Sequence, residues 1–255
     1  LCTCAGGYYV GAMAKDLLLA IDQGTTGSTA LLLSPDGRIL GRENREFQQH
    51  FPKPGWVEHD PMEIWRNTQA VIRGALGKSG VKSSDLAAIG ITNQRETAVV
   101  WDKHTGRPFY NAIVWQCTRT DTICNDLMAE GGQDRFREKT GLPIATYFSG
   151  PKIKWILDNV PEARKAADAG NAHVGTIESW LIWWLTGGPD GGAHVTDVTN
   201  ASRTLLMNLN TLDWDPEILA ALGIPRRILP RIVPSVDPET WGKTSPGGPA
   251  GARVP

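Results

Sequence analysis

A polar turn containing glycine and threonine follows the first apolar stretch of the chain. Asp22, Gln23, Gly24, Thr25 and Thr26 stand there in direct succession. Gly24 lets the backbone turn tightly beside a ligand, and the amides and hydroxyls of Thr25 and Thr26 can hold phosphate oxygens. The carboxylate of Asp22 can organise Mg²⁺ and its waters. A simple hairpin turn also explains these residues, and from them alone it is the favoured interpretation.

A second polar stretch, Thr-Asn-Gln-Arg-Glu-Thr at positions 92–97, lies between two apolar runs. The guanidinium of Arg95 carries five N–H donors, and the carboxylate of Glu96 carries two acceptor oxygens. Neighbouring hydroxyls of a small polyol both donate and accept hydrogen bonds, so this pair is equipped to hold one. The alternative is a solvated hairpin loop with an exposed salt bridge between the two residues, which would add little stability.

Two aromatic residues, Trp115 and Tyr147, could complete such a site. An aromatic face can cover the C–H side of a polyol while polar groups hold its oxygens. Because the chain contains ten tryptophans, either ring alone is more simply explained by packing. Trp180, Trp183 and Trp184 recur at helical spacing and are predicted to lie in the core. Together the polar and aromatic residues favour a small neutral polar ligand.

Strands must hold these polar turns in place. Apolar runs bounded by turn residues predict strands at 16–22, 30–33 and 38–41, which would form an antiparallel meander. The alternation in the first strand is imperfect, so we expect it to be buried on both faces. Two further buried strands are predicted at 86–92 and 97–101.

Helices are predicted after the meander and in the middle of the chain. Asp60 is a suitable N-cap for the first, Pro61 suits its first position, Glu63 can close a capping box, and Gly77 or Gly80 can end it. The other predicted helices lie within 120–130, 152–159, 162–169, 177–186 and 217–222. This order of elements predicts a three-layer α/β domain with a mixed sheet flanked by helices.

Composition excludes several classes of protein. The 26 basic and 27 acidic residues give a net charge of −1, which argues against nucleic acid as a partner. The most apolar stretches, 17–21 and 180–185, are far shorter than the roughly 20 residues that span a bilayer. The cysteines at 2, 4, 117 and 124 lack zinc-site spacing, so we expect reduced thiols in a cytoplasmic protein.

Six motifs together resemble those of the FGGY family of carbohydrate kinases, and within it the glycerol kinases. They are Asp-Gln-Gly-Thr-Thr at 22–26, Gly-Trp-Val-Glu-His-Asp-Pro at 55–61, Asn-Gln-Arg-Glu-Thr at 93–97, Asn-Ala-Ile-Val-Trp-Gln at 111–116, Tyr-Phe-Ser-Gly at 147–150 and Thr-Asp-Val-Thr-Asn-Ala-Ser-Arg-Thr at 196–204. The first motif alone indicates an actin/hexokinase-type ATPase. The second and third together point to the glycerol kinases.

The resemblance implies a ribonuclease H-like domain of the actin/hexokinase type. This N-terminal domain would occupy residues 15–255, and residues 1–14 would be a disordered or non-native leader, because Met13 looks like a natural start. The implied activity is the ATP- and Mg²⁺-dependent conversion of glycerol to sn-glycerol 3-phosphate. The implied full-length enzyme is a homo-oligomer.

The resemblance also assigns roles to residues by their place in the motifs. The glycerol-contacting positions correspond to Arg95, Glu96, Trp115 and Tyr147. The phosphate-binding positions correspond to Thr25, Thr26 and Gly27, and Asp22 corresponds to the Mg²⁺ position, with binding through water.

The family's catalytic base is an Asp in a Gly-Asp-Gln segment, which we expect beyond Pro255 with most of the nucleotide-binding domain. The chain is therefore predicted to be a glycerol-binding half that is inactive alone. Two alternatives stay open. One is a different sugar kinase of the same family, acting on xylulose or gluconate, and the other is a non-catalytic polyol-binding module.

Overall fold

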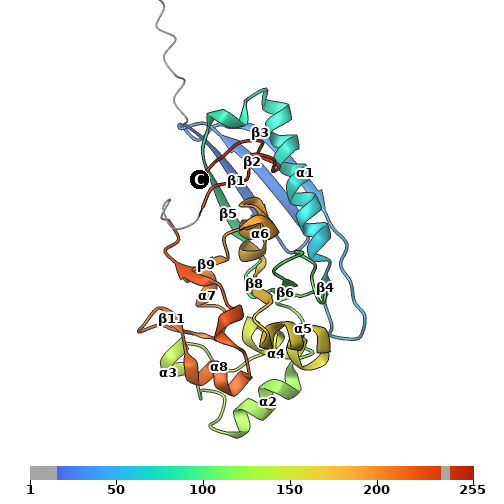
Figure 1. The fold of residues 1–255 in the computed structure, drawn as a ribbon, viewed down its shortest axis with the longest axis vertical. Helices are drawn as coiled ribbons and strands as arrows, with labels where there is room; N and C mark the ends of the chain where they lie inside the picture. The colour runs from blue at the N-terminus through green and yellow to red at the C-terminus, as the bar shows by residue number, and fades with distance from the viewer. Residues whose placement is uncertain (1–15, 237–241) are drawn as a thin grey trace, which may run out of the picture.

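The structure of the protein, a computed structural model, describes residues 16–236 and 242–255 (Figure 1). The predicted leader at 1–14, with Cys2 and Cys4, lies outside the described residues. A mixed sheet forms one end of the molecule, and its strands are β1 (Leu17–Gln23), β2 (Gly27–Leu33), β3 (Ile39–Glu46) and β5 (Leu86–Asn93). β1 to β3 form the predicted antiparallel meander, and β5 pairs with β1 in parallel, which gives the order β3-β2-β1-β5.

One long helix, α1 (Pro61–Ser79), covers one face of this sheet (Figure 1). It begins at the predicted residue, because the carboxylate of Asp60 accepts a hydrogen bond of 2.8 Å from the amide two residues on. The predicted capping box does not form, since the carboxylate of Glu63 accepts from the amide of Gln48 instead. It ends at Gly80, whose φ of 69° suits glycine. Gly41 on β3 allows a close approach to the helix, since a Cβ there would stand 2.2 Å from the carbonyl oxygen of Ala75.

β1 is well buried on one face only, so the prediction that both faces are buried is wrong. Leu19 and Ile21 are 0% and 1% exposed, whereas Leu18 is 45% exposed and Asp22 is exposed. Strands of antiparallel meanders commonly have one solvated face, and the apolar residue at position 18 hid this alternation in the sequence. Asp22 therefore stands on the solvated side at the end of β1.

A second four-stranded sheet lies beside the first (Figure 1). Its strands, in spatial order, are β4 (Glu58–His59), β7 (Ala112–Ile113), β6 (Ala98–Asp102) and β8 (Ala172–Thr176). The predicted strands at 86–92 and 97–101 are present as β5 and β6. β6 is buried as predicted, whereas in β5 only Leu86 is buried, so the prediction of a buried strand is wrong there. The two strands belong to different sheets. Residues 92–97 therefore cross from one sheet to the other, and the hairpin alternative for this stretch is wrong.

Each of the predicted helices is present. In chain order the helices after α1 are α2 (Asp121–Ala129), α3 (Arg137–Thr140), α4 (Ser149–Asn159), α5 (Pro161–Asp168), α6 (Ile177–Leu185), α7 (Val198–Ala201) and α8 (Pro216–Leu222). Short strands pair as β9 (Val195–Asp197) with β12 (Arg231–Val233) and β10 (Met207–Asn208) with β11 (Asp213–Trp214). Among the described residues, no helix is long and apolar enough to span a membrane.

Buried tryptophans join α6 to the second sheet. The ring of Trp101 on β6 packs against those of Trp180 and Trp183 on α6, with centroid distances of 5.2 and 5.8 Å. All three are at most 1% exposed, which confirms the core prediction for the two helical residues. Trp184 is half-buried and stacks on Trp65 of α1 at 5.6 Å, so α6 also contacts the helix that covers the first sheet.

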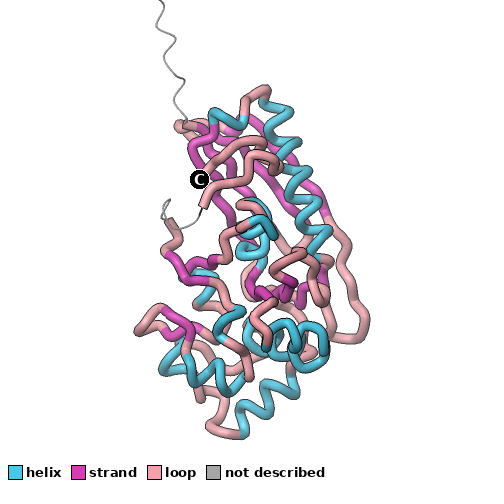
Figure 2. The backbone as a smooth tube through the Cα atoms, viewed as in Figure 1, coloured by secondary structure: helices cyan, strands magenta, loops and turns pink. Residues whose placement is uncertain are grey.

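The end of the chain returns to the first sheet. The described residues from 242 onward form loops and turns without a helix or strand (Figure 2). The amide of Ile89 on β5 donates a 2.8 Å hydrogen bond to the carbonyl oxygen of Pro255. This bond fixes the end of the chain at the open edge of β5.

Three histidines have lowered pKa values, and we expect acid to destabilise the fold through them. His59 is buried, and His173 and His194 are half-buried. Burial lowers the pKa of His59 and of His173 to about 4, and it lowers the pKa of His194 to about 3, where the nearby His173 adds to the effect. In the unfolded chain a histidine takes up its proton near pH 6.5. Above that pH these histidines do not lower the free energy of unfolding. Between that pH and about pH 4 the free energy of unfolding falls, by up to ~1.4 kcal/mol per pH unit for each histidine.

Urea denaturation at about pH 7.5 and about pH 5 measures this loss. His173→Phe keeps an aromatic ring next to His194, at a centroid distance of 3.8 Å in the wild type, and it removes one titrating group. The variant is expected to have a shallower pH dependence of stability than the wild type. A wild-type free energy of unfolding that stays constant across this range would contradict the expectation.

Candidate active site

The polar turn between β1 and β2 is a hairpin that other segments hold from two sides. Within it, the amide of Gly24 donates to the carbonyl oxygen of Gly27 at 2.9 Å, so the hairpin prediction is confirmed. The side-chain amide of Gln94 donates to the carbonyl oxygen of Gly24 at 3.2 Å. The indole Nε1–H of Trp115 donates to Oγ1 of Thr25 at 3.0 Å. The predicted phosphate turn thus touches both the 92–97 crossing and the predicted substrate tryptophan.

Glu96 points inward from the crossing between the sheets. It is 2% exposed, and its φ of 65° lies in the left-handed region that few residues other than glycine adopt. Its Oε1 accepts a 2.7 Å bond from Nε of Arg203, far away in the sequence. The alternative of an exposed Arg95–Glu96 salt bridge is therefore wrong, because the carboxylate pairs with a different arginine inside the protein.

The two predicted aromatic residues lie against each other. The ring centroids of Trp115 and Tyr147 are 5.6 Å apart at an interplanar angle of 64°. The guanidinium carbon of Arg203 lies 5.7 Å from the Tyr147 ring centre, within the range of a cation–π contact. Arg203 therefore links Glu96 to Tyr147, and Trp115 links Tyr147 to Thr25.

Arg95 is exposed and lines a cavity of about 490 Å³ together with Asn93, Glu178 and Asp197. It makes no ion pair with any residue in the described ranges. Burial raises the pKa of the Glu178 carboxyl. Burial would also raise the pKa of Asp197, but hydrogen bonds from neighbouring hydroxyl and amide groups outweigh it and hold that pKa below its usual range. The cavity thus offers one cation and several acceptors.

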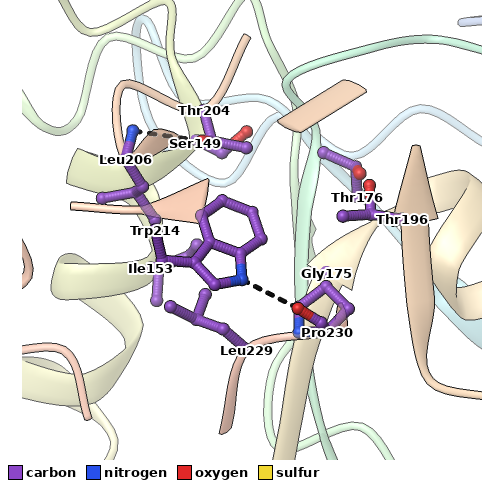
Figure 3. A pocket seen from close by; sticks show the side chains of 10 residues that line it. All are labelled: Ser149, Ile153, Gly175, Thr176, Thr196, Thr204, Leu206, Trp214, Leu229 and Pro230. Atoms are coloured by element: carbon purple, nitrogen blue, oxygen red, sulfur yellow. Dashed lines mark hydrogen bonds between the residues drawn. The ribbon is translucent and has the colours of Figure 1, made fainter. Parts of the chain in front are cut away.

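A much smaller void is lined in part by Ser149 and Ile153 of α4 (Figure 3). Ser149, Thr204 and Trp214 are among its lining residues, and its volume of about 10 Å³ holds no more than about one water molecule. The indole of Trp214 already donates to the carbonyl oxygen of Pro230 at 2.8 Å. This void is a gap in the packing and has no room for a polyol.

Asp22 is the predicted Mg²⁺ position. It is exposed at the end of β1, where it pairs across the sheet with Thr29 and Thr92. The described ranges contain no group of three or more His, Cys, Asp and Glu residues that could hold a metal ion. Mg²⁺ is commonly held by one or two carboxylates together with waters and substrate phosphates. A single exposed carboxylate near the turn at 24–27 fits that way of binding.

Sequence reasoning missed the residues that hold the predicted ones in place. Arg203 pairs with Glu96, and Oγ of Ser149 donates to the carbonyl oxygen of Glu96 at 3.0 Å. Both residues stand inside the motifs at 147–150 and 196–204. Their presence in those motifs was the only signal in the sequence that they belong to the site. Residue type and spacing do not predict that either of them contacts Glu96.

The match to a protein-family model decides the family. The model describes the N-terminal domain of the FGGY family of carbohydrate kinases, and it matches residues 17–250. The chain belongs to the FGGY family. All six motifs that resemble those of this family lie within the matched region.

Curated relatives of this FGGY chain are glycerol kinases. The glycerol kinase of Chloroflexus aggregans is 66% identical over 216 residues, which cover 85% of this chain and 43% of the relative. The glycerol kinase of a Roseiflexus species is 61% identical over 223 residues, or 88% of this chain and 45% of the relative. The chain thus spans a little under half the length of these relatives.

Solved structures of FGGY kinases share the fold. A glycerol kinase from Plasmodium falciparum, crystallised with ADP, has a TM-score of 0.84 and 37% identity, covering 90% of this chain and 45% of that one. A gluconate kinase from Lactobacillus acidophilus has a TM-score of 0.75 and 26% identity, covering 86% of this chain and 42% of that one. These neighbours confirm the predicted actin/hexokinase-type fold.

Proposed function

We propose that residues 15–255 form the glycerol-binding domain of an ATP-dependent glycerol kinase, which makes sn-glycerol 3-phosphate. The observation that carries the proposal is the grouping of Glu96, Trp115 and Tyr147 beside the Thr25 turn, with Arg95 next in the chain. The glycerol kinases at 66% and 61% identity support glycerol as the substrate over xylulose or gluconate.

Each proposed contact uses a different property of glycerol. Arg95 would donate hydrogen bonds to one hydroxyl oxygen. Glu96 would accept from a hydroxyl through Oε2, because Arg203 already holds Oε1. Charge-assisted hydrogen bonds of this kind are stronger than neutral ones. The rings of Trp115 and Tyr147 would cover the C–H groups, so that the polyol is held by polar groups on one side and aromatic faces on the other.

The turn at 24–27 would face the nucleotide. The hydroxyls of Thr25 and Thr26 and the amide of Gly27 are suited to phosphate oxygens, and Asp22 would hold Mg²⁺ through water. Mg²⁺, when bound, neutralises charge on the transferring phosphoryl group. The hydrogen bond from Trp115 to Thr25 would fix the position of the bound polyol relative to the phosphate turn. Phosphoryl transfer is catalysed mainly by such positioning together with stabilisation of charge.

We assign proton abstraction to a carboxylate outside these residues, because the Gly-Asp-Gln sequence expected for the base does not occur in the chain. The chain alone is accordingly proposed to bind glycerol without sustained turnover. A cytoplasmic location and homo-oligomeric assembly of a full-length enzyme stay predictions.

An assay of ADP release tests the proposed function. The chain would be assayed alone and after fusion to the C-terminal half of the Chloroflexus aggregans relative. We expect glycerol-dependent ADP release from the fusion and none from the chain. A fusion that prefers xylulose or gluconate would support another kinase of the family, and glycerol binding without turnover in the fusion would support a non-catalytic module. Sustained turnover by the chain alone would contradict the assignment of the base.

A further inference from the structure

Lys152 on α4 is a fully buried cation, 0% exposed. Its ammonium donates to the carbonyl oxygens of Thr146, Tyr147 and Phe148, the last two at 2.6 and 3.1 Å. An ammonium has three N–H donors, so these three successive carbonyl groups satisfy it completely. The segment that they belong to lies in a turn immediately before the helix and is neither helix nor strand.

The stability of α4 does not explain this lysine. A cation in the first turn of a helix opposes the helix dipole, and a buried charge is costly unless it is fully hydrogen-bonded. Burial lowers the pKa of Lys152 to about 7. The charges of Glu96 and Arg119 and the thiols of Cys117 and Cys124 also act on this pKa, with smaller effects. The structural consequence of burying this ammonium is that its three hydrogen bonds fix the backbone of residues 146–148.

That backbone carries one wall of the proposed glycerol site. Tyr147 is 37% exposed and its ring meets Trp115 at 5.6 Å. The same helical turn also holds Glu96, because Ser149 donates to its carbonyl oxygen at 3.0 Å. The first turn of α4 is thus tied by Lys152 to the aromatic side of the site and by Ser149 to the acidic side.

We propose that Lys152 is a positioning residue for polyol binding, which sets the place of the Tyr147 ring by holding the backbone of residues 146–148. The inference rests on the proposed function, since it acts on the proposed glycerol site. A ligand that must first order a loose segment of its site loses the part of the binding free energy that the ordering costs. Loss of the three hydrogen bonds should therefore reduce glycerol affinity even in a chain that remains folded.

The test compares Lys152→Met with Lys154→Met in the complete chain. Lys154 lies on the same helix, where it pairs with Asp158 at 2.8 Å on the surface, so the control makes the same substitution outside the site. Calorimetry should find a glycerol Kd about 3- to 10-fold higher for Lys152→Met and an unchanged Kd for Lys154→Met. Equal affinity of Lys152→Met and the wild type would overturn the proposal.

A double-mutant cycle separates positioning from general damage. In a Tyr147→Ala background, Lys152→Met should add no further loss of glycerol affinity, because its effect passes through the Tyr147 ring. A full additional loss in that background would overturn the proposal. If Lys152→Met does not fold, Lys152→Gln, which keeps two N–H donors, takes its place in the cycle.

Hydrogen exchange distinguishes failure of this inference from failure of the proposed function. If the wild-type chain binds no glycerol, the proposed function fails. Lys152→Met should still speed amide exchange in the peptide that spans residues 146–148, relative to Lys154→Met. Identical exchange in the two variants would show that Lys152 does not hold this segment, whatever the ligand.

Discussion

Replacing Arg95 by alanine is expected to weaken glycerol binding by about 100-fold, because charge-assisted hydrogen bonds contribute about 1.5–3 kcal/mol each. Arg95 is exposed and makes no ion pair within the described ranges. Its loss should therefore change the free energy of unfolding by no more than about 0.5 kcal/mol. Calorimetric titration with glycerol and urea denaturation of the same samples measure the two quantities.

Arg107→Ala is the matched control for Arg95→Ala. Arg107 is also exposed and lines a different cavity, beside Asp102 and Glu162. Its loss should leave the glycerol Kd unchanged. A wild-type Kd in Arg95→Ala would remove this arginine from the site, and the cavity that it lines would then have no part in binding.

Replacing Glu96 by glutamine should remove measurable glycerol binding and also destabilise the fold. The substitution keeps the size of the side chain but removes the charge that pairs with Arg203 at 2.7 Å. Breaking a buried ion pair typically costs about 3–5 kcal/mol. The Arg203 side chain is 30% exposed, so water can solvate it in part and we expect a loss of about 1–3 kcal/mol. Urea denaturation and calorimetry report the two effects separately.

The Arg203→Met variant separates two roles of the Glu96 carboxylate, its ion pair with Arg203 and its proposed contact with glycerol. Glu96→Gln should cost less stability in the Arg203→Met background than alone, because the pair is already broken there. Its effect on glycerol affinity should persist in that background, since Oε2 is the proposed contact. Additive losses of stability would show that the two residues are not coupled. Unchanged glycerol affinity in Glu96→Gln would exclude the carboxylate from the site.

Local signals in the sequence were sufficient for most of the secondary structure. The capping residue Asp60 and the terminal Gly80 fix α1 through contacts within a few residues, and such contacts can be read from the sequence. The strands of the meander and the helical tryptophans follow from hydrophobic spacing in the same way. Two predictions were wrong: that both faces of β1 are buried, although Leu18 is exposed, and that residues 92–97 form a hairpin. Burial and sheet membership depend on distant segments, which local signals do not report.

The sequence was enough to identify residues of the candidate site, but not the contacts that hold them in place. Glu96, Trp115 and Tyr147 were identified by motif and by chemistry, and the structure groups them. The partner of Glu96 is 107 residues away, and no local pattern predicts a pairing over that distance. Lys152 was missed for another reason, since lysine is almost never fully buried without partners, and its partners are backbone carbonyl groups that carry no sequence signal.

Titration of the chain with glycerol, followed by NMR of the tryptophan indole N–H groups, tests the central claim most directly. The indole of Trp115 donates to Thr25 beside the ring of Tyr147, so its signal reports on the proposed glycerol site and the phosphate turn together. Trp115→Phe assigns that signal by removing it. The account predicts a saturable shift of the Trp115 signal on addition of glycerol, with the signals of the core tryptophans Trp101 and Trp180 unchanged. A Trp115 signal that does not respond while glycerol binds would contradict the account.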